Sequence, residues 1–436
     1  LGFVRLSILD LSPAGHQPMF SHDQRYVVVF NGEIFNYIEL REELRSFGYS
    51  FVTNTDTEVL IAAYHHWGEQ CLHRFNGMWA FVIYDKETKT VFASRDRYGI
   101  KPFYYSQTEE SFLFASEITP ILSQLKEKPT PNRHAIFEYL AFNRTDQTEN
   151  TFFNEVKKMQ HGHYMLIKGS EIKITKWYEI EEQIKKAKPF SSDVEFLESF
   201  QDAVKIRLRS DVSVGVCLSG GLDSSSIVDV LLKNLKKKDL NTFSAVYGDG
   251  KAGDEMEFIN EFNGIVKKMH YITPNADSLL LDLETFIDAH AEPIPSTSPY
   301  AQFKVMQLAH KNVVVTLDGQ GADEMLSGYH YFFGFFFKDL LKRGKFFLLF
   351  KEIVAYCLNH KSLYGIKTFV YFLLPAFLKT KTRVQKIGYL DKNFVEIFGQ
   401  KSSIVENLYA SESLQEALIN HFNYKLEHLL KWEDRN

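Results

Sequence analysis

The stretch that most constrains the fold lies at residues 213–226, where an apolar run leads into a short loop of small polar residues. Residues 214–218 are apolar and rich in valine, which is typical of a parallel strand covered on both faces. Residues 225–235 have the apolar spacing of a helix. The loop between them reads Ser-Gly-Gly-Leu-Asp-Ser. A strand, a glycine-rich loop and a helix in this order predict a ligand site at the carboxyl end of a strand in an α/β sheet.

The composition of this loop favours a phosphate ligand. Gly220 and Gly221 let the backbone approach a ligand without a Cβ in the way, and the amides at the start of a helix favour negative charge. The hydroxyls of Ser219 and Ser224 add donors. Asp223 would repel phosphates unless a divalent cation lay between them, so the loop predicts Mg²⁺. The loop has no lysine and so differs from the common G-x-x-x-x-G-K-[ST] loop; the alternative is a plain strand-to-helix turn.

A second strand opens into a similar loop. Residues 313–317 are apolar, and Asp318 and Gly319 follow them directly. If this strand lies beside the first, Asp323 and Asp223 would face one another across a pyrophosphate and hold Mg²⁺ between them. The alternative for Asp323 is an acidic residue in the first turn of a helix, where the helix dipole stabilises it.

The periodicity along the chain predicts two domains, at residues 1–178 and 193–436, joined by a charged segment that contains a proline. In the first domain, strands mixed with helices predict an α+β sandwich. In the second, alternating strands and helices predict a doubly wound parallel sheet, followed by an all-helical extension from residue 330. We expect strands at residues 1–10, 25–30, 78–84, 91–94, 112–115, 214–218, 241–247, 269–272 and 313–317, and helices at 37–47, 57–67, 193–208, 225–235, 254–268 and 368–378.

Composition limits the partners. The net charge of −5 carries no basic excess, so we expect no nucleic-acid partner, and no membrane partner is expected either. Three widely spaced cysteines form neither a disulfide framework nor a metal motif, and no signal peptide opens the chain, so we expect a cytoplasmic protein. The apolar segment at 368–378 is too short to span a bilayer and contains Pro375, and we interpret it as a buried helix.

The Ser-Gly-Gly-Leu-Asp-Ser motif resembles the pyrophosphate loop of the ATP pyrophosphatases, and the chain as a whole resembles the glutamine-hydrolysing asparagine synthetases. In that family an N-terminal-nucleophile glutaminase domain releases ammonia to an ATP-pyrophosphatase domain that activates aspartate as β-aspartyl-AMP. The stretches that carry the resemblance are, in chain order, RLSILD from Arg5, AGHQPM from Ala14, NGEIFN from Asn31, TDTEV from Thr55, RDRYGIKP from Arg95, FASE from Phe114 and the loop at Ser219.

The resemblance implies a role for each matching residue. Arg5 would pair with the α-carboxylate of glutamine, while Glu33 and Asp56 would hold its α-ammonium. The Asn31 side chain and the Gly32 amide would form an oxyanion hole. Without the resemblance, Asn31-Gly32 is typical of a hairpin turn. The residues implied for ATP, pyrophosphate and Mg²⁺ are Leu218, Ser219, Gly220, Gly221, Asp223, Ser224, Val246, Asp318, Gly319 and Asp323. The implied substrates are glutamine, aspartate and ATP, and a homodimer is an expected assembly.

The sequence departs from the family pattern at three places. The family's nucleophile is an N-terminal cysteine whose own amine acts as the base, and this chain begins with Leu1. The final residues, from Lys431, match the beginning of a longer family stretch, so we expect a fragment of a longer product. Gln320 replaces an acidic residue of the family, and an amide cannot take up a proton at neutral pH. Two alternatives therefore stay open: an acceptor other than aspartate, such as a sugar acid or a peptide, or a catalytically incomplete nucleotide-binding fragment.

Overall fold

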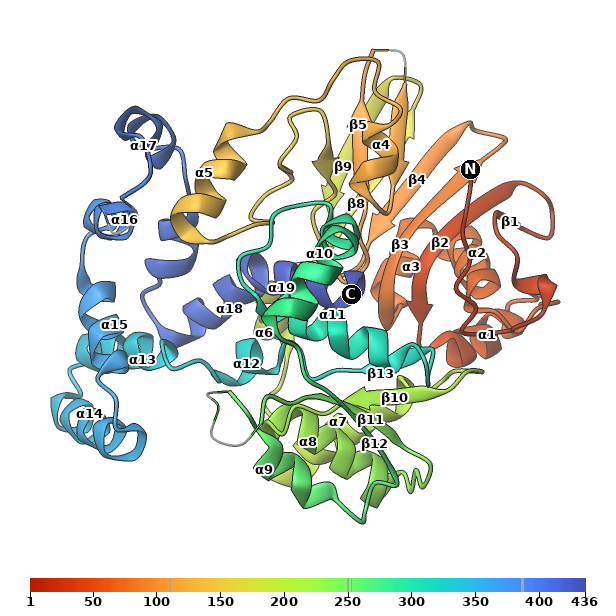
Figure 1. Cartoon of the computed structure of the whole chain (residues 1–436). Coiled ribbons are helices and arrows are strands. Elements are labelled where there is room, and N and C mark those ends of the chain that lie inside the picture. The colour runs from red at the N-terminus through yellow and green to blue at the C-terminus, as the bar shows by residue number, and fades with distance from the viewer. Residues whose placement is uncertain (110, 249–250, 252, 386–387) are drawn as a thin grey trace. The chain divides into compact units, whose positions relative to one another are not determined.

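The computed structural model describes residues 1–109, 111–248, 251, 253–385 and 388–436 (Figure 1). The chain forms two compact units, and each combines segments that are far apart in sequence. The first unit contains Leu1–Phe103, Met159–Gly319 and Lys431–Asn436, and the second contains Tyr104–Lys158 and Gln320–Leu430. Among the described residues, no helix has the length and apolar character needed to cross a bilayer.

An antiparallel sheet dominates the N-terminal part of the first unit. Its strands lie in the order β1-β2-β3-β4-β8-β9, and alternate residues of β2 and β3 pack against helices α1 and α2 in one core. This confirms the predicted strands at 25–30, 78–84 and 91–94. The elements are β1 (Met19–Phe20), β2 (Tyr26–Ile34), α1 (Tyr37–Ser46), α2 (Asp56–Trp67), α3 (Cys71–Arg74), β3 (Gly77–Asp85), β4 (Thr90–Arg95), β8 (His163–Lys168), β9 (Glu171–Lys176) and α6 (Ile180–Lys186).

One strand predicted for this part is absent, and another is longer than predicted. Residues 1–10 form no strand, because no described strand pairs with them, and Val4 and Leu6 are exposed. The strand predicted at 25–30 continues to Ile34, because β3 pairs with it over its whole length. Asn31 and Gly32 therefore lie inside a strand, opposite Ala80 and Trp79, which excludes the hairpin turn.

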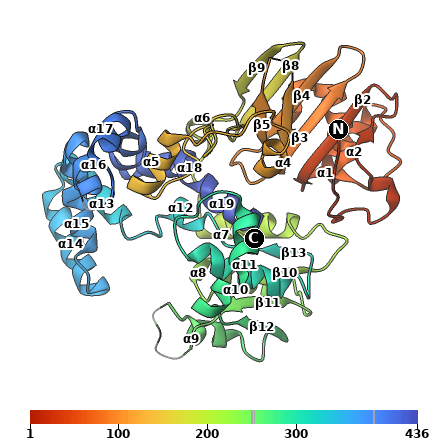
Figure 2. The ribbon, with the colours of Figure 1, turned by 45° about the horizontal axis from the view of Figure 1, so that its top comes forward.

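The rest of the first unit is a four-stranded parallel sheet in the order β12-β11-β10-β13. Helices cover both faces: Val216 and Leu218 share a core with α7 and α8, whereas Cys217 and Phe243 pack towards α11 (Figure 2). The predicted doubly wound sheet is confirmed. Its elements are α7 (Asp193–Ile206), β10 (Val214–Cys217), α8 (Leu222–Asp229, continued by a π-helical turn at Val230–Asn234), β11 (Asn241–Ala245), α9 (Met256–Ile259), β12 (Lys268–Ile272), α10 (Ala276–His290), α11 (Ser298–Ala309) and β13 (Val315–Leu317).

The helix predicted at 254–268 is much shorter than expected. Only α9 and a 3-10 turn at Asn260–Phe262 form there. Gly264 adopts a φ of +78°, a left-handed conformation that ends a right-handed helix. The apolar spacing of this segment arises from the packing of Ile259 and Val266 against the sheet.

The second unit combines a small antiparallel sheet with the helical C-terminal region. The sheet order is β6-β5-β7, and the predicted strand at 112–115 and the helical region are confirmed. The elements are β5 (Tyr104–Gln107), β6 (Phe112–Ala115), α4 (Ile118–Leu122), α5 (Arg133–Phe142), β7 (Lys157–Lys158), α12 (Ala322–Leu326), α13 (Phe332–Lys342), α14 (Phe346–His360), α15 (Tyr364–Leu373), α16 (Ala376–Gln385), α17 (Lys392–Gly399), a π-helical turn (Val405–Tyr409), α18 (Leu414–Tyr424) and α19 (Leu426–Arg435). Residues 431–435 of α19 belong to the first unit.

The buried helix predicted at 368–378 is wrong in two respects. The chain breaks between α15 and α16 at Pro375, which cannot continue a helix. Val370, Leu373 and Phe377 are exposed.

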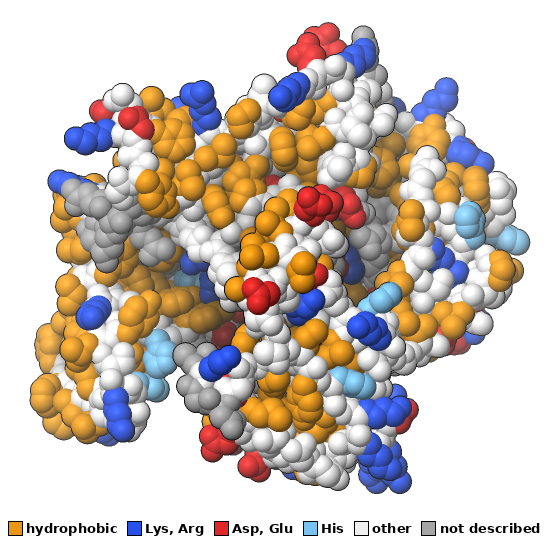
Figure 3. Space-filling view, viewed as in Figure 1, with side chains coloured by type: hydrophobic (Ala, Val, Ile, Leu, Met, Phe, Trp, Pro, Cys, Tyr) orange, Lys and Arg blue, Asp and Glu red, His pale blue; other side chains and the backbone are white. Residues whose placement is uncertain are grey.

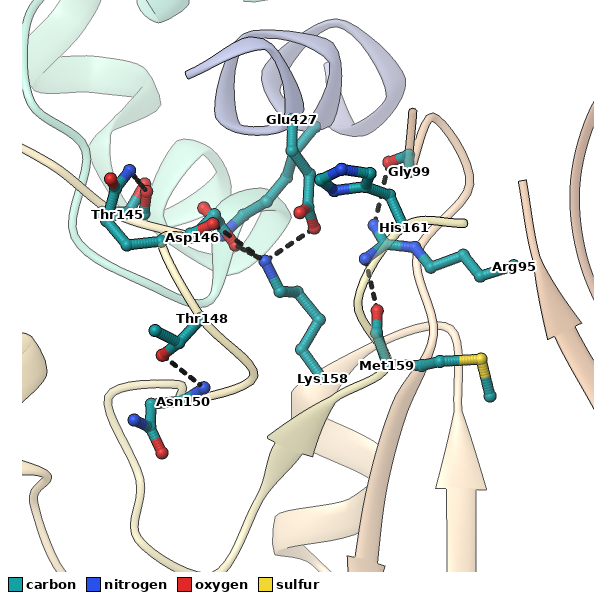
Figure 4. Close-up of polar contacts among 12 residues, drawn as sticks. Arg95, Gly99, Thr145, Asp146, Thr148, Asn150, Lys158, Met159, His161 and Glu427 are labelled. Atoms are coloured by element: carbon teal, nitrogen blue, oxygen red, sulfur yellow. Dashed lines mark hydrogen bonds and ion pairs between the residues drawn. The ribbon is translucent and has the colours of Figure 1, made fainter. Parts of the chain in front are cut away.

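A buried ion-pair network joins the two segments of the second unit (Figure 4). Lys158 Nζ lies 3.2 Å from Asp146 Oδ1 and 2.6 Å from Glu427 Oε1, and the Lys158 side chain is only 1% exposed. The network therefore connects the end of β7 to the start of α19.

Candidate functional site

Two buried carboxyl groups lie at the end of β2. Glu33 is 4% exposed, and its Oε1 has no hydrogen-bond partner among the described residues. Asp56 begins α2, and its Oδ2 accepts a hydrogen bond from the backbone amide of Ile34 at 2.8 Å. Burial, together with the charge of Asp56, raises the pKa of Glu33 to about 8, and burial raises that of Asp56 to about 6. A cationic ligand group would compensate both carboxylates, which fits the predicted ammonium site.

Gly32 is required by the close packing of β2 against β3. Its φ is +148°, and an added Cβ would overlap the Met78 carbonyl oxygen and lie 2.8 Å from the Trp79 Cα. Asn31 precedes it on the strand and is half-buried. The two predicted oxyanion-hole residues are thus held by the sheet next to Glu33.

The Arg5 guanidinium binds the chain that follows it. Its Nη1 donates to the Ser12 carbonyl at 2.9 Å, and its Nη2 donates to the carbonyls of Leu9 and Asp10 at 2.9 and 2.5 Å. The guanidinium also lies against Gly15, where a side chain would displace it. Three of its five N–H donors are used in this way, which leaves two for a ligand carboxylate.

The stretch from Arg95 to Lys101 is a structural loop that the sequence analysis left without a role. The buried Arg95 donates to the carbonyls of Met159, Gly99 and Lys101 at 2.7 to 2.8 Å (Figure 4). Asp96 accepts from four backbone amides, those of Trp79, Tyr98, Ile100 and Lys101, at 3.0 to 3.2 Å. An adjacent arginine and aspartate at the end of an apolar strand were the signal for this loop, because such charges are buried only when they are satisfied.

The loop after β10 is preorganised by hydrogen bonds among its own residues. Ser219 donates its amide to Ser224 Oγ at 3.2 Å, and its Oγ accepts from the Gly221 amide at 3.2 Å. Gly220 has a φ of +88°, and an added Cβ would lie 2.9 Å from the Glu255 carbonyl oxygen. The loop leads into the N-terminus of α8, where backbone amides suit an anion.

The loops after β10 and β13 meet, as predicted, because the two strands are parallel neighbours. An added Cβ on Gly319 would lie 2.9 Å from the Asp223 Cβ and 3.2 Å from the Ser224 amide nitrogen. From β10 the chain adds β11 and β12 on one side of the sheet, and then adds β13 on the other side of β10. Ligands of open α/β sheets bind at such a switch point.

The two residues expected to flank an adenine lie at the same edge of the sheet. Val246 follows β11 and is half-buried; its amide donates to the Ile272 carbonyl at 2.9 Å. Leu218 is fully buried, and its carbonyl accepts from Ser244 Oγ at 2.6 Å. The Leu218 side chain therefore supports the loop from within the core.

A group of polar side chains lies on the α11 side of this switch point. Gln302 Nε2 donates to Glu433 Oε2 at 2.5 Å and lies 3.9 Å from Cys217 Sγ. Burial raises the pKa of Asp318, and burial together with the Asp318 charge raises that of Glu433 to about 8. Gln302 and Glu433 were not predicted, because no local sequence pattern connects them to the loop.

The donor set around the first loop fits Mg²⁺. Asp223 supplies a carboxylate in the first turn of α8, and Mg²⁺ is ordinarily held by one or two carboxylates with phosphate oxygens and water. The described residues contain no cluster of three metal-ligating side chains, so a site made by protein alone is not found among them. Asp323 lies in the first turn of α12, in the other compact unit, and its pairing with Asp223 stays a prediction.

Comparison with known proteins gives two family matches. Residues 1–178 match the glutamine amidotransferase domain, and residues 195–420 match asparagine synthase.

Several relatives are similar over most of this chain. A putative glutamine-hydrolysing asparagine synthetase 2 of Methanocaldococcus jannaschii is 35% identical, covering 86% of this chain and 75% of its own length. Asparagine synthetase 1 of Bacillus subtilis is 33% identical over 76% of this chain, and amidase chry2 of Gibberella zeae is 30% identical over 76%. The chain spans 51% of the length of each of these last two relatives.

Among solved structures, glutamine phosphoribosylpyrophosphate amidotransferase from B. subtilis matches at 15% identity with a TM-score of 0.28, covering 61% of this chain and 52% of that chain. The two family matches together extend over most of the chain, in the order in which the two sites occur. The chain belongs to the asparagine synthase family, with a glutamine amidotransferase domain ahead of the asparagine synthase domain.

Proposed function

We propose that the protein containing this chain is an ATP-dependent ligase that takes ammonia from glutamine and joins it to aspartate, giving asparagine, glutamate, AMP and pyrophosphate. The observation that supports this most is the meeting of two glycine-bearing loops at the switch point of the parallel sheet, with Gly319 against Asp223. Binding ATP at this place exposes its α-phosphate to a carboxylate acceptor.

In the amidotransferase domain, Glu33 and Asp56 bind the α-ammonium of glutamine, and Arg5 binds its α-carboxylate. The buried, unpartnered Oε1 of Glu33 supports this assignment. Asn31 and the Gly32 amide stabilise the oxyanion of the tetrahedral intermediate. By the resemblance to the family, the attacking group would be the thiolate of an N-terminal cysteine.

In the synthetase domain, the loop from Ser219 to Ser224 and the residues Asp318 and Gly319 hold the phosphates. Val246 and the backbone at Leu218 border the adenine, because the Leu218 side chain is buried in the core. Asp223 and Asp323 hold Mg²⁺, which when bound offsets the charge of the leaving pyrophosphate. The acceptor carboxylate displaces pyrophosphate from ATP, and ammonia then displaces AMP from the acyl-adenylate.

The test uses the complete gene product. It should release pyrophosphate from ATP only when Mg²⁺ and aspartate are present, and form asparagine when glutamine is added. Asp223→Asn should abolish pyrophosphate release and leave glutaminase activity. The matched control is Asp229→Asn on the same helix, where the carboxylate pairs with Lys233 at 2.7 Å on the surface. Pyrophosphate release by Asp223→Asn at the parent rate would exclude the proposed metal site.

A second candidate is transfer of ammonia to another carboxylate, such as a sugar acid or a peptide. It is supported by Gln320, which replaces an acidic residue at the second loop, and by the amidase names of the Gibberella zeae relative and of a Penicillium rubens relative. Pyrophosphate release with such an acceptor, and none with aspartate, would decide for it. A third, a nucleotide-binding fragment without catalysis, requires residues 1–436 to bind ATP-Mg²⁺ in calorimetry; no heat of binding would exclude it.

A further inference from the structure

Helix α14 carries an exposed apolar stripe along one side. Phe346, Phe347, Phe350, Val354 and Leu358 are all exposed, and Phe347 is 84% exposed. Their spacing of three and four residues places them on one face of the helix. The other side of α14 is buried: Leu349 and Tyr356 pack against Phe337 and Leu340 of α13.

Further apolar residues are exposed in the turn after α14 and on α15. Leu363 and Tyr364 at the turn, and Val370 and Leu373 on α15, are exposed. Figure 3 shows hydrophobic side chains gathered over α14, with lysines and arginines at their margin. We call these nine residues the α14 surface. Exposed apolar surface on this scale, with a polar rim, marks an interaction site.

Basic residues are concentrated around the α14 surface. Residues 342–381 contain eight lysines and arginines and one acidic residue, Glu352, although the whole chain has a net charge of −5. Seven of the eight are exposed; Lys379 is buried. The exposed ones are Lys342, Arg343, Lys345, Lys351, Lys361, Lys367 and Lys381. Lys342 pairs with Glu412 and Arg343 with Asp339, so the basic excess rests on the other five.

We propose that the α14 surface binds the face of an anionic lipid bilayer, with α14 lying in the plane of the interface. Phenylalanines and leucines would enter the headgroup region, and the surrounding lysines would attract anionic headgroups. A helix of 15 residues is too short to span a bilayer, for which about 20 are needed, so the contact is with the surface only. The net charge of −5 is a sum over the whole chain and does not reveal the basic excess of residues 342–381, so composition predicted no membrane partner.

The basic residues around the α14 surface favour an anionic bilayer over the other partners that an apolar surface can bind. A second copy of this chain would bring the same basic excess against itself, which is unfavourable. A segment of the complete protein could cover the apolar stripe, but would need a matching acidic surface to neutralise the lysines. An anionic bilayer both covers the apolar stripe and neutralises the lysines.

The experiment is vesicle flotation of the complete gene product. Vesicles of phosphatidylcholine alone are compared with vesicles of phosphatidylcholine mixed with phosphatidylglycerol. The protein should float with the mixed vesicles only, and added salt should weaken binding because it screens the lysines. No flotation with the mixed vesicles would overturn the proposal.

Two matched pairs of variants separate the stripe from the charge. Phe347→Ser/Phe350→Ser removes two exposed phenyl rings that would enter the headgroup region, and should weaken binding to the vesicles at least about tenfold. Leu280→Ser/Leu281→Ser, at exposed positions on α10, should bind like the parent. Lys345→Glu/Lys351→Glu should lose the preference for anionic vesicles, and the exposed control Lys188→Glu/Lys267→Glu should keep it. Equal binding by the test and control variants in either pair would contradict the proposal.

A spectroscopic readout tests whether the stripe is free before binding. The four tryptophans of the chain lie outside residues 342–381, so Phe347→Trp places a single reporter on the stripe. The difference in emission between Phe347→Trp and the parent, which has the other four tryptophans, should be that of an exposed indole without vesicles and should shift to the blue with anionic ones. A blue-shifted emission before vesicles are added would show that another part of the protein covers the stripe, and would overturn the proposal.

Discussion

Gly319 lies against Asp223 where two neighbouring parallel strands end, and an added Cβ on Gly319 would lie 2.9 Å from the Asp223 Cβ. The two loops of the synthetase domain therefore touch through a residue that has no side chain. Because the two loops are in contact at this point, both of them fix the position of Asp223.

Gly319→Ala should displace the Asp223 loop. Because the added methyl would contact Asp223 and the Ser224 amide, we expect a loss of about 1–3 kcal/mol in stability, with ATP-Mg²⁺ affinity reduced more than tenfold. Thermal unfolding and calorimetry measure the two effects. Gly2→Ala, where an added Cβ meets nothing within 4 Å, is the control. Unchanged ATP affinity in Gly319→Ala would show that the contact does not position the loop.

Gly32→Ala should damage the antiparallel sheet. The added methyl would overlap the Met78 carbonyl, and the positive φ adds strain, so the variant should unfold at a clearly lower temperature and lose glutaminase activity. Gly48→Ala isolates the cost of a positive φ, because an added Cβ there meets nothing within 4 Å. The free energy of unfolding of Gly48→Ala should fall by only about 1 kcal/mol. Similar losses in both variants would mean that β2 moves to accommodate the methyl.

Glu33→Gln should change how stability depends on pH. The pKa of Glu33 is raised to about 8, above its ordinary value of 4.5, by burial and by Asp56. The protonated Glu33 carboxyl therefore contributes its full stabilisation when the pH is below 4.5, the ordinary pKa. This contribution is lost as the pH rises through about 8. The parent should lose thermal stability from about pH 5 to about pH 9, and Glu33→Gln should lose less over that range.

The control for Glu33→Gln is Glu87→Gln, where the carboxylate is exposed and pairs with Arg25 at 3.1 Å. Its pH profile should follow the parent. Glutamine binding should also release protons near neutral pH, because the ligand ammonium favours the ionised carboxylate; calorimetry in buffers of different ionisation enthalpy measures this. No proton release would argue against an ammonium beside Glu33.

Lys158→Met should destabilise the second unit by about 3–5 kcal/mol, because it removes the buried Lys158 ammonium from beside the carboxylates of Asp146 and Glu427. Adding Glu427→Gln should recover part of the loss. The control is Lys157→Met at the adjacent, exposed position, where the nearest carboxylate oxygen is 4.0 Å away. Denaturant unfolding of the parent, the two single variants Lys158→Met and Glu427→Gln, and the double variant gives the coupling energy. A value near zero would mean that the buried pair does not stabilise the unit.

Local pattern predicted the elements that have strong periodicity or a clear loop. β2, β3, β4, α2 and β10 form where apolar residues repeat with the period of a strand or a helix. The prediction failed at residues 1–10, because a strand needs a partner, and at 254–268, because a glycine conformation ended the helix. Pro375, which separates α15 from α16, was visible in the sequence, but the exposure of the residues around it was not.

The sequence by itself determined the phosphate-type loop, the doubly wound parallel sheet and the candidate residues, because glycines, serines and aspartates after a buried strand have few other uses. Only the tertiary structure decided which residues meet. Strand pairing brings Gly319 to Asp223, helix α2 brings Asp56 to the backbone next to Glu33, and α19 brings Glu433 to Gln302 and Glu427 to Lys158. These contacts join residues that are 22 to 269 positions apart. No periodicity encodes them, because they depend on how whole elements pack.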